Sequence, residues 1–470
     1  MYFKQIVHDD LGCASYVIGS SVTAQCAVVD PRWEIEPYLE IAVQQGFRIT
    51  HIIETHNHAD HVSGHGRLAR ATGAQIDIYE EAGVDYLHHP LKDNETIDLG
   101  DVRLHVVHTP GHRPEHIALA VEDASRGGEP WMVLTGDSLF VGDVARPDLA
   151  IDGKEGAARL YHSLHERLLR LPEYVEVYPG HVSGSLCGRV TSSVNSTTVG
   201  YEKRFNEALR RSERDAFIRF MNENLPERPP NMAKIVEANR GPLLMKLTLP
   251  SYLGADTVAR QKTDGAVMLD VRSPDAFLSE HIPGSIHVAL TGKQFGTRVG
   301  FIVPVDVPLM LITEDEAQAQ KAADALQVVA YDSVIGYSTV ASWKAAGNPV
   351  ASTDTISPQS LYDQLSEAEA LNVLDVREPS EWAEGHIEGA AFVPYRELPA
   401  RLSEVPAGRV AVICDAGHRS VIAASLLERA GLTEVSNVDQ GMSGWRKAGL
   451  PEVSGARHRV ESVIERISMA

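Results

Sequence analysis

The chain has 470 residues, enough for about three domains of ordinary size. It carries 43 lysines and arginines against 64 aspartates and glutamates, a formal net charge of −21. That charge excludes nucleic acid as an expected partner, because phosphate binding needs a basic surface. Four cysteines form no disulfide framework in so long a chain. With no apolar stretch of membrane-spanning length and no signal-peptide pattern, we expect a cytoplasmic protein without a membrane partner.

The first functional signal along the chain is a dense group of metal-ligand residue types. The segment 55–61 reads Thr-His-Asn-His-Ala-Asp-His and follows an apolar, β-branched run, 47–53, that predicts a buried strand. His56, His58, Asp60 and His61 therefore fall at one strand end, where imidazoles and a carboxylate can meet on one metal. A histidine-rich surface loop is the alternative interpretation, and this density of ligand types makes it the weaker one.

Three later strand ends supply further ligand types. Predicted strands cover 75–79, 102–107, 117–121 and 131–134, and turns carry His112 (after Thr-Pro-Gly), Asp137 (after Thr-Gly) and His181 (after Pro-Gly). Strand ends on one edge of a β-sandwich would converge on one pocket. A charged stretch, 201–224, is predicted to be helical, and Gly241-Pro242 is typical of a hinge into the next unit.

The remainder of the chain is an internal repeat. Val267-Met-Leu-Asp-Val-Arg-Ser-Pro is matched by Asn372-Val-Leu-Asp-Val-Arg-Glu-Pro, which places Asp375 and Arg377 opposite Asp270 and Arg272. The spacing of about 100 residues is that of one small domain. Buried strands alternate with helical patterns in each copy, which favours parallel sheets flanked by helices. We place the domains at 1–245, 250–350 and 355–458, with 347–357 as the linker between the copies.

The histidine and aspartate pattern of residues 1–245 resembles the metallo-β-lactamase superfamily. The resemblance implies an αββα sandwich, so that the whole chain is α/β. It implies His56, His58 and His112 at one metal, Asp60, His61 and His181 at a second, and Asp137 as the bridge. Hydrolases of this group use two zinc ions to activate water.

A second signal resembles the persulfide dioxygenase branch of that superfamily. After Asp137 the chain reads Ser-Leu-Phe-Val-Gly-Asp-Val-Ala-Arg146-Pro-Asp148. The resemblance implies one Fe(II) per chain, held by His56, His112 and Asp137 as a facial triad with open positions. His58, Asp60, His61 and His181 would then orient the ligands. Arg146 and Asp148 are candidate substrate-binding residues, and a local salt bridge that closes the loop is an equally weighted alternative.

The segment after His181 departs from the pattern of relatives that use glutathione. Those relatives carry an aromatic residue there, whereas this chain reads Val-Ser-Gly-Ser-Leu-Cys187. This departure argues against glutathione as the thiol carrier. It also places Cys187 near the expected pocket, where a thiol could exchange sulfur with the substrate. A small packed residue is an equally good interpretation of a single cysteine.

The second copy of the repeat contains a cysteine loop. A predicted buried strand ends at Cys414 and a helix follows within a few residues, so backbone N–H groups at a helix N-terminus would stabilise a thiolate or persulfide anion. The pattern strongly resembles the rhodanese active loop. The loop residues are Asp415, Ala416, Gly417, His418, Arg419 and Ser420. Arg419 would add positive charge, and four residues between Cys414 and Arg419 favour sulfur over phosphate chemistry, since phosphatase loops have five.

The first copy lacks this chemistry. Thr313 stands where Cys414 stands, and Glu314, Asp315 and Glu316 make its loop acidic, which would repel a sulfur anion. We therefore expect a rhodanese fold without the transfer residue. An aspartate–arginine pair occurs at the same place in both copies, as Asp270 and Arg272 in the first and Asp375 and Arg377 in the second. Its presence in the copy without the cysteine indicates a scaffold role.

Together these signals predict a fusion of a persulfide dioxygenase with rhodanese modules. The expected reactions are iron-dependent oxidation of a low-molecular-weight thiol persulfide by O₂ to sulfite, and sulfur transfer through a Cys414 persulfide that forms or uses thiosulfate. We also expect a homo-oligomer. Two alternatives stay open: a binuclear zinc thioester hydrolase resembling glyoxalase II, with two zinc ions per chain, and a non-enzymatic sulfur carrier or redox sensor.

Overall fold

The computed structural model describes residues 1–455, except 9, 183–191, 193, 224, 226, 245–248, 293 and 368–369. The chain divides into two compact units. The first contains residues 1–248 together with 292–300 and 324–332, and the second contains the rest from residue 249 onward. Within the first unit, the Val62 N–H donates to the Val328 carbonyl at 2.7 Å. None of the described helices is long and apolar enough to cross a membrane.

The first unit is built on two six-stranded sheets. One sheet has the order β1 (Tyr2–Val7), β2 (Ala14–Ser20), β3 (Gln25–Val29), β4 (Arg48–Ile53), β5 (Gln75–Tyr79) and β6 (His89–Leu91). The other has the order β12 (Thr197–Thr198), β11 (Glu176–Pro179), β10 (Pro130–Gly136), β9 (Ile117–Asp123), β8 (Val102–His108) and β7 (Thr96–Asp98). The predicted strands at 75–79, 102–107, 117–121 and 131–134 correspond to β5, β8, β9 and β10.

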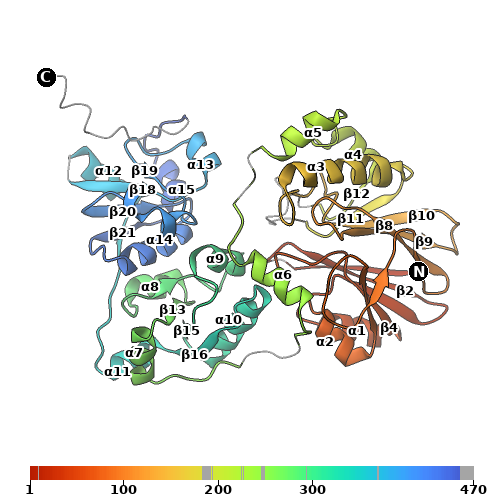
Figure 1. Ribbon diagram of the computed structural model, residues 1–470. Coiled ribbons are helices and arrows are strands. Elements are labelled where there is room, and N and C mark those ends of the chain that lie inside the picture. The colour runs from red at the N-terminus through yellow and green to blue at the C-terminus, as the bar shows by residue number, and fades with distance from the viewer. Residues whose placement is uncertain are drawn as a thin grey trace. The chain divides into compact units, whose positions relative to one another are not determined.

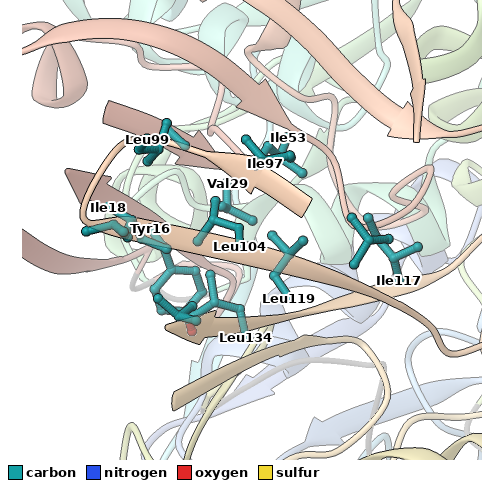
Figure 2. Close-up of a cluster of buried hydrophobic side chains, with 14 of the residues drawn as sticks. Tyr16, Ile18, Val29, Ile53, Ile97, Leu99, Leu104, Ile117, Leu119 and Leu134 are labelled. Carbon is teal, nitrogen blue, oxygen red and sulfur yellow. The ribbon is translucent and has the colours of Figure 1, made fainter. Parts of the chain in front are cut away.

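The two sheets pack face to face through a cluster of apolar side chains (Figure 2). Tyr16, Ile18 and Val29 come from the first sheet, and Leu104 and Leu119 from the second, and each is at most 1% exposed. Burial on this scale is the main term that stabilises the sandwich, at roughly 1.5–3 kcal/mol for each fully buried large side chain. The metal-ligand residue types lie beyond the strand ends of this core.

Helices cover the outer faces of both sheets, which confirms the predicted αββα sandwich (Figure 1). α1 (Glu36–Gln45) and α2 (His65–Thr72) lie on the first sheet, α3 (Gly153–His162), α4 (Val199–Phe205) and α5 (Arg214–Met221) lie on the second, and α6 (Met232–Arg240) follows.

The expected single helix at 201–224 is wrong, because the segment forms α4 and α5 with a turn between them. Asn206 ends α4 in an extended conformation, and its side-chain oxygen accepts hydrogen bonds from the N–H groups of Ala208 and Leu209 at 3.1 and 3.4 Å. An asparagine that bonds to the backbone in this way competes with helix propagation.

The second unit contains two parallel sheets, as predicted from the repeat. The four-stranded sheet has the order β14 (Ile286–His287), β13 (Val267–Asp270), β15 (Leu309–Ile312) and β16 (Val334–Ser338). The five-stranded sheet has the order β17 (Asp354–Ile356), β21 (Val435–Val438), β20 (Arg409–Ile413), β18 (Leu371–Asp375) and β19 (Ala391–Phe392). The stretch 347–357, expected to be a linker, therefore includes one strand of the second sheet.

Helices flank both parallel sheets (Figure 1). Those of the first copy are α7 (Ala255–Thr263), α8 (Pro274–Ser279), α9 (Phe295–Ile302), α10 (Glu316–Val328) and α11 (Val340–Ala345). Those of the second copy are α12 (Pro358–Ser366), α13 (Pro379–Glu384), α14 (His418–Arg429) and α15 (Gly441–Lys447). Thr313 and Cys414 each directly follow an interior strand of the sheet of their copy, β15 and β20. The two loops are therefore structural equivalents.

Candidate metal centre and cysteine loop

Three predicted ligands meet at the ends of the sandwich strands. One ligand atom from each of His56, His112 and Asp137 lies within 4.8 Å of the other two. The Nε2 atoms of His56 and His112 lie 4.0 and 3.5 Å from Asp137 Oδ2. These separations exceed hydrogen-bond length, whereas two ligands at about 2.0–2.2 Å from one ion are separated by roughly 3–4 Å. The geometry therefore suits three atoms that share a cation.

The orientation of both imidazoles is set by their other ring nitrogen. The Thr55 hydroxyl donates to Asp30 at 2.8 Å, so it accepts a hydrogen bond from His56 Nδ1 at 2.9 Å. His112 Nδ1 donates to the backbone carbonyl of Arg146 at 3.0 Å. Partners of this kind fix the tautomer of metal-binding histidines and leave Nε2 as the ligand atom. Both rings are therefore held ready for a metal.

The three ligand atoms of this group suit a bound cation, because they have no other partner among the described residues. His56 Nε2, His112 Nε2 and Asp137 Oδ2 are buried and have no hydrogen-bond partner among the described residues. Each of the three side chains is only 1% exposed. Burying polar atoms without a partner is costly, and a metal ion at this point would satisfy all three.

A second group of ligand types lies beside the first. Ligand atoms of His58, Asp60 and His61 also lie within 4.8 Å of one another. His181, by contrast, has both ring nitrogens engaged: Nδ1 lies 2.7 Å from Asp137 and Nε2 lies 2.7 Å from Asp60. His58 is held by Asp30 and Glu54 at 3.2 and 3.4 Å. The structure thus brings all seven predicted residues to one end of the sandwich.

The electrostatics of the centre follow from burial and from these contacts. Burial alone would lower the pKa of His181, but the carboxylates of Asp137 and Asp60 outweigh it and raise that pKa to about 10. Burial would raise the pKa of Asp137, but His181 outweighs it and holds that pKa well below its usual range. Desolvation lowers the pKa of His56, which keeps its imidazole neutral as a ligand must be.

Two supporting residues have no signal in the sequence. The buried His116 accepts a hydrogen bond from the Asp137 N–H at 2.8 Å, and burial lowers its pKa to about 3, so the ring stays neutral. The side-chain amide of Asn239, on α6, donates to the carbonyls of His58 and His61 at 3.0 and 2.8 Å. Nothing in the pattern around these two residues distinguishes them from ordinary core residues.

Arg146 and Asp148 form the local salt bridge weighed as an alternative. Arg146 Nε and Nη2 lie 2.7 and 2.9 Å from the two Asp148 carboxylate oxygens, a bidentate pair. Arg146 also touches the centre through its backbone carbonyl, which holds His112. The loop therefore positions a ligand, whatever its side chains do toward a substrate.

Cys187 lies outside the described residues. Of the other histidines, His65 is buried against Tyr86, and His89 is 41% exposed.

The cysteine loop has the geometry expected from its sequence. Cys414 follows β20, is 1% exposed, and its sulfur accepts a hydrogen bond from the Gly417 N–H at 3.1 Å. The Ser420 hydroxyl lies 3.4 Å from the same sulfur. Gly417 has a φ of +89° and stands at the N-terminus of α14, where the helix dipole favours an anion. The loop can therefore stabilise a sulfur anion.

Arg419 is not a free positive charge beside this loop. Its Nη1 and Nη2 atoms donate to the two carboxylate oxygens of Glu381, both at 2.6 Å. Burial would raise the pKa of Glu381, but Arg419 outweighs it and holds that pKa below its usual value, so the carboxylate is ionised. The expected charge is present, but a carboxylate that the sequence did not single out accompanies it.

In the first copy, the equivalent loop makes different contacts. The Thr313 hydroxyl donates to the Asp315 carbonyl at 2.9 Å, and Gln318, at the position of Arg419, accepts from the Glu314 N–H at 2.8 Å. Both copies keep a buried aspartate–arginine pair after the first strand: Asp270 with Arg272 at 2.6 Å and Asp375 with Arg377 at 2.7 Å. These pairs also bond to nearby backbone carbonyls, which agrees with a scaffold role.

Comparison with known proteins covers both parts of the chain. A family model for the metallo-beta-lactamase superfamily matches residues 8–181, and one for the rhodanese-like domain matches 254–348 and 357–448. The mitochondrial persulfide dioxygenase of Homo sapiens is 29% identical over 239 residues, covering 48% of this chain and 82% of that protein. A hydroxyacylglutathione hydrolase of Polaromonas sp. is 30% identical over 240 residues, covering 46% of this chain and 87% of that protein.

A solved structure extends the similarity into the second half of the chain. A metallo-beta-lactamase from Staphylococcus aureus is 30% identical, with a TM-score of 0.66, and the match covers 72% of this chain and 99% of that one. The chain therefore belongs to the metallo-beta-lactamase superfamily, with persulfide dioxygenases among its relatives, and is a fusion in which two rhodanese-like domains follow.

Proposed function

We propose that the first unit oxidises the persulfide of a low-molecular-weight thiol to sulfite, using O₂ and a single Fe(II). The observation that carries the proposal is the group His56, His112 and Asp137, with three buried ligand atoms that lack partners among the described residues. Two imidazoles and one carboxylate are the ligand set of non-haem iron oxygenases. The similarity to a persulfide dioxygenase supports the substrate class.

The net reaction takes one persulfide, one O₂ and one water to one thiol, one sulfite and two protons. Four electrons pass from the outer sulfur to O₂, and the bond between the two sulfurs is broken. An iron ion held by the triad supplies open coordination positions and the redox chemistry. The chain's own contribution is to fix the three ligands through Thr55, Arg146 and His116, and to bury them away from bulk water.

The contacts of His181 agree with the one-metal arrangement. Both of its ring nitrogens are hydrogen-bonded to carboxylates, Asp137 on one side and Asp60 on the other. A second metal would need one of these nitrogens as a ligand. In the one-metal arrangement, His181 instead orients Asp137 and neutralises part of the carboxylate charge.

For the third domain we propose sulfur transfer through Cys414. The Gly417 N–H and the N-terminus of α14 would stabilise a persulfide anion on this sulfur. Attack of sulfite on the outer sulfur forms thiosulfate and returns the Cys414 thiolate, and the reverse reaction loads the cysteine. The two proposed sites share sulfite, which is a product of one and a substrate of the other.

A binuclear zinc thioester hydrolase remains the second candidate. His58, Asp60 and His61 form their own group, and the atoms His58 Nδ1, His61 Nε2 and Asp60 Oδ1 have no hydrogen-bond partner among the described residues. Similarity to a hydroxyacylglutathione hydrolase favours the same candidate. The cysteine domain has no evident use in that reaction.

Metal analysis of the purified protein distinguishes the two candidates. We expect about one iron per chain, and O₂ uptake that occurs only when a persulfide is supplied, because a single triad offers one octahedral site. Asp137→Asn should remove most of the iron and the O₂ uptake together, whereas Asp98→Asn, at an exposed residue of strand β7, should change neither. Two zinc ions per chain together with thioester hydrolysis would contradict the iron assignment.

A further inference from the structure

The salt bridge between Glu381 and Arg419 joins the cysteine loop to helix α13. It uses both terminal nitrogens of the guanidinium and both carboxylate oxygens, and the two side chains are 19% and 28% exposed. A bidentate pair of this kind is geometrically specific and stronger than a single surface contact. Because it is partly open to solvent, another anion can reach the guanidinium.

Glu381 is itself held in place by the helix. Its Oε2 accepts a hydrogen bond from the Glu378 N–H at 2.9 Å, as part of a capping box at the start of α13. The neighbouring Glu378 carboxylate pairs in turn with Arg396 at 2.6 Å. Arg419 and Arg396 therefore each have a carboxylate partner, and the charge that Arg419 offers to a substrate anion is smaller than the guanidinium alone would provide.

Comparison of the two copies of the repeat distinguishes the Glu381–Arg419 salt bridge from the aspartate–arginine pairs of the scaffold. Alignment on the paired aspartates places Ala276 opposite Glu381, and alignment on the loops places Gln318 opposite Arg419 and Thr313 opposite Cys414. The first copy thus lacks the cysteine, the arginine and the glutamate together. It keeps the buried Asp270–Arg272 pair, so the fold itself does not require the glutamate. The salt bridge accompanies the cysteine chemistry.

We propose that Glu381 is a built-in counter-ion of Arg419 that competes with the anionic sulfur substrate. In the resting site it holds the guanidinium beside the cysteine loop. A sulfur oxyanion, such as sulfite or the sulfonate end of thiosulfate, takes its place on Arg419 when it approaches Cys414. The carboxylate therefore sets how strongly this site binds oxyanions, and it discriminates against them relative to uncharged sulfur donors. This inference rests on the proposed sulfur-transfer role of Cys414.

Glu381→Gln in the full chain tests the inference. Glutamine keeps the acceptor for the Glu378 N–H but removes the charge. We expect the KM for thiosulfate to fall about threefold to tenfold with little change in kcat, because one repelling charge near the anion is lost. The KM for an uncharged sulfane-sulfur donor, such as a neutral organic trisulfide, should stay the same. Glu384→Gln, an exposed residue on the same helix, makes the same charge change and should behave as the unsubstituted protein.

Two results would overturn the proposal. If the KM for thiosulfate is unchanged or rises, Glu381 acts only by positioning Arg419. If the KM values for both donors change by the same factor, the substitution has disturbed the loop in general. A calorimetric titration with sulfite gives a readout that does not depend on turnover, and Glu381→Gln should bind sulfite more tightly than Glu384→Gln. Absence of sulfur transfer in the unsubstituted protein would contradict the proposed function of Cys414, while this titration still decides the role of Glu381.

Discussion

At the scale of single residues, a glycine precedes three of the seven residues at the metal centre. Gly111, Gly136 and Gly180 stand directly before His112, Asp137 and His181. A Cβ atom on Gly136 would lie 2.7 Å from His116 Nε2 and 2.9 Å from the Thr55 hydroxyl, and this residue has a φ of +47°. The chain approaches the supporting side chains so closely here that only glycine fits.

Gly136→Ala should therefore damage both stability and metal binding. We expect the free energy of unfolding to fall by about 2–4 kcal/mol, from the left-handed conformation and from displacement of His116. Iron content should fall with it, because His116 holds the backbone of Asp137. Chemical denaturation and metal analysis would measure the two effects.

Gly142→Ala is the matched control for this substitution. Gly142 also has a positive φ, +78°, but an added Cβ would meet nothing within 4 Å. It should lose only about 1 kcal/mol from backbone strain and keep its iron. Equal losses in the two variants would show that the close approach to His116 is unimportant.

At the scale of elements, the strand ends and the repeat were predictable from the sequence. Each ligand type follows an apolar run and a turn residue, and such local patterns place β4, β8, β10 and β11 with their residues His56, His112, Asp137 and His181. The equivalence of Thr313 and Cys414 followed from the alignment of the two copies. These predictions succeeded because the signals are local and the turn chemistry is specific.

The parts that escaped prediction depend on contacts between distant segments. Asn239 reaches His61 across 178 positions in the chain, and Glu381 reaches Arg419 across 38. A pattern in one segment carries no information about such a partner. The break between α4 and α5 was missed for a different reason: the charged composition suits a helix, while a single asparagine side chain ends it.

At the scale of the whole molecule, the proposed function places two different sulfur chemistries on one chain. The proposed iron site lies in the first compact unit and Cys414 in the second. In the proposed reactions sulfite links the two sites, since it is a product of the first and a substrate of the second. If the sites exchange only this small molecule, each should work without the other.

Cys414→Ser tests this independence. The substitution removes the sulfur that carries the persulfide, so thiosulfate formation should be lost, with at least about a hundredfold fall in rate. O₂ uptake with a supplied persulfide should stay within about twofold of the unsubstituted protein, since no ligand of the metal centre changes. Parallel assays of thiosulfate and O₂ would show both. Loss of the two activities together would contradict independent sites.

The most direct test of the account is removal and replacement of the metal. The protein is stripped with a chelator, then divided and loaded with Fe(II) or Zn(II), and O₂ uptake is measured with a thiol persulfide. We predict that Fe(II) restores uptake at about one equivalent per chain and that Zn(II) restores none, because zinc has no redox chemistry. Restoration by two equivalents of Zn(II) of a thioester hydrolase activity, with no O₂ uptake in the iron-loaded protein, would contradict the account.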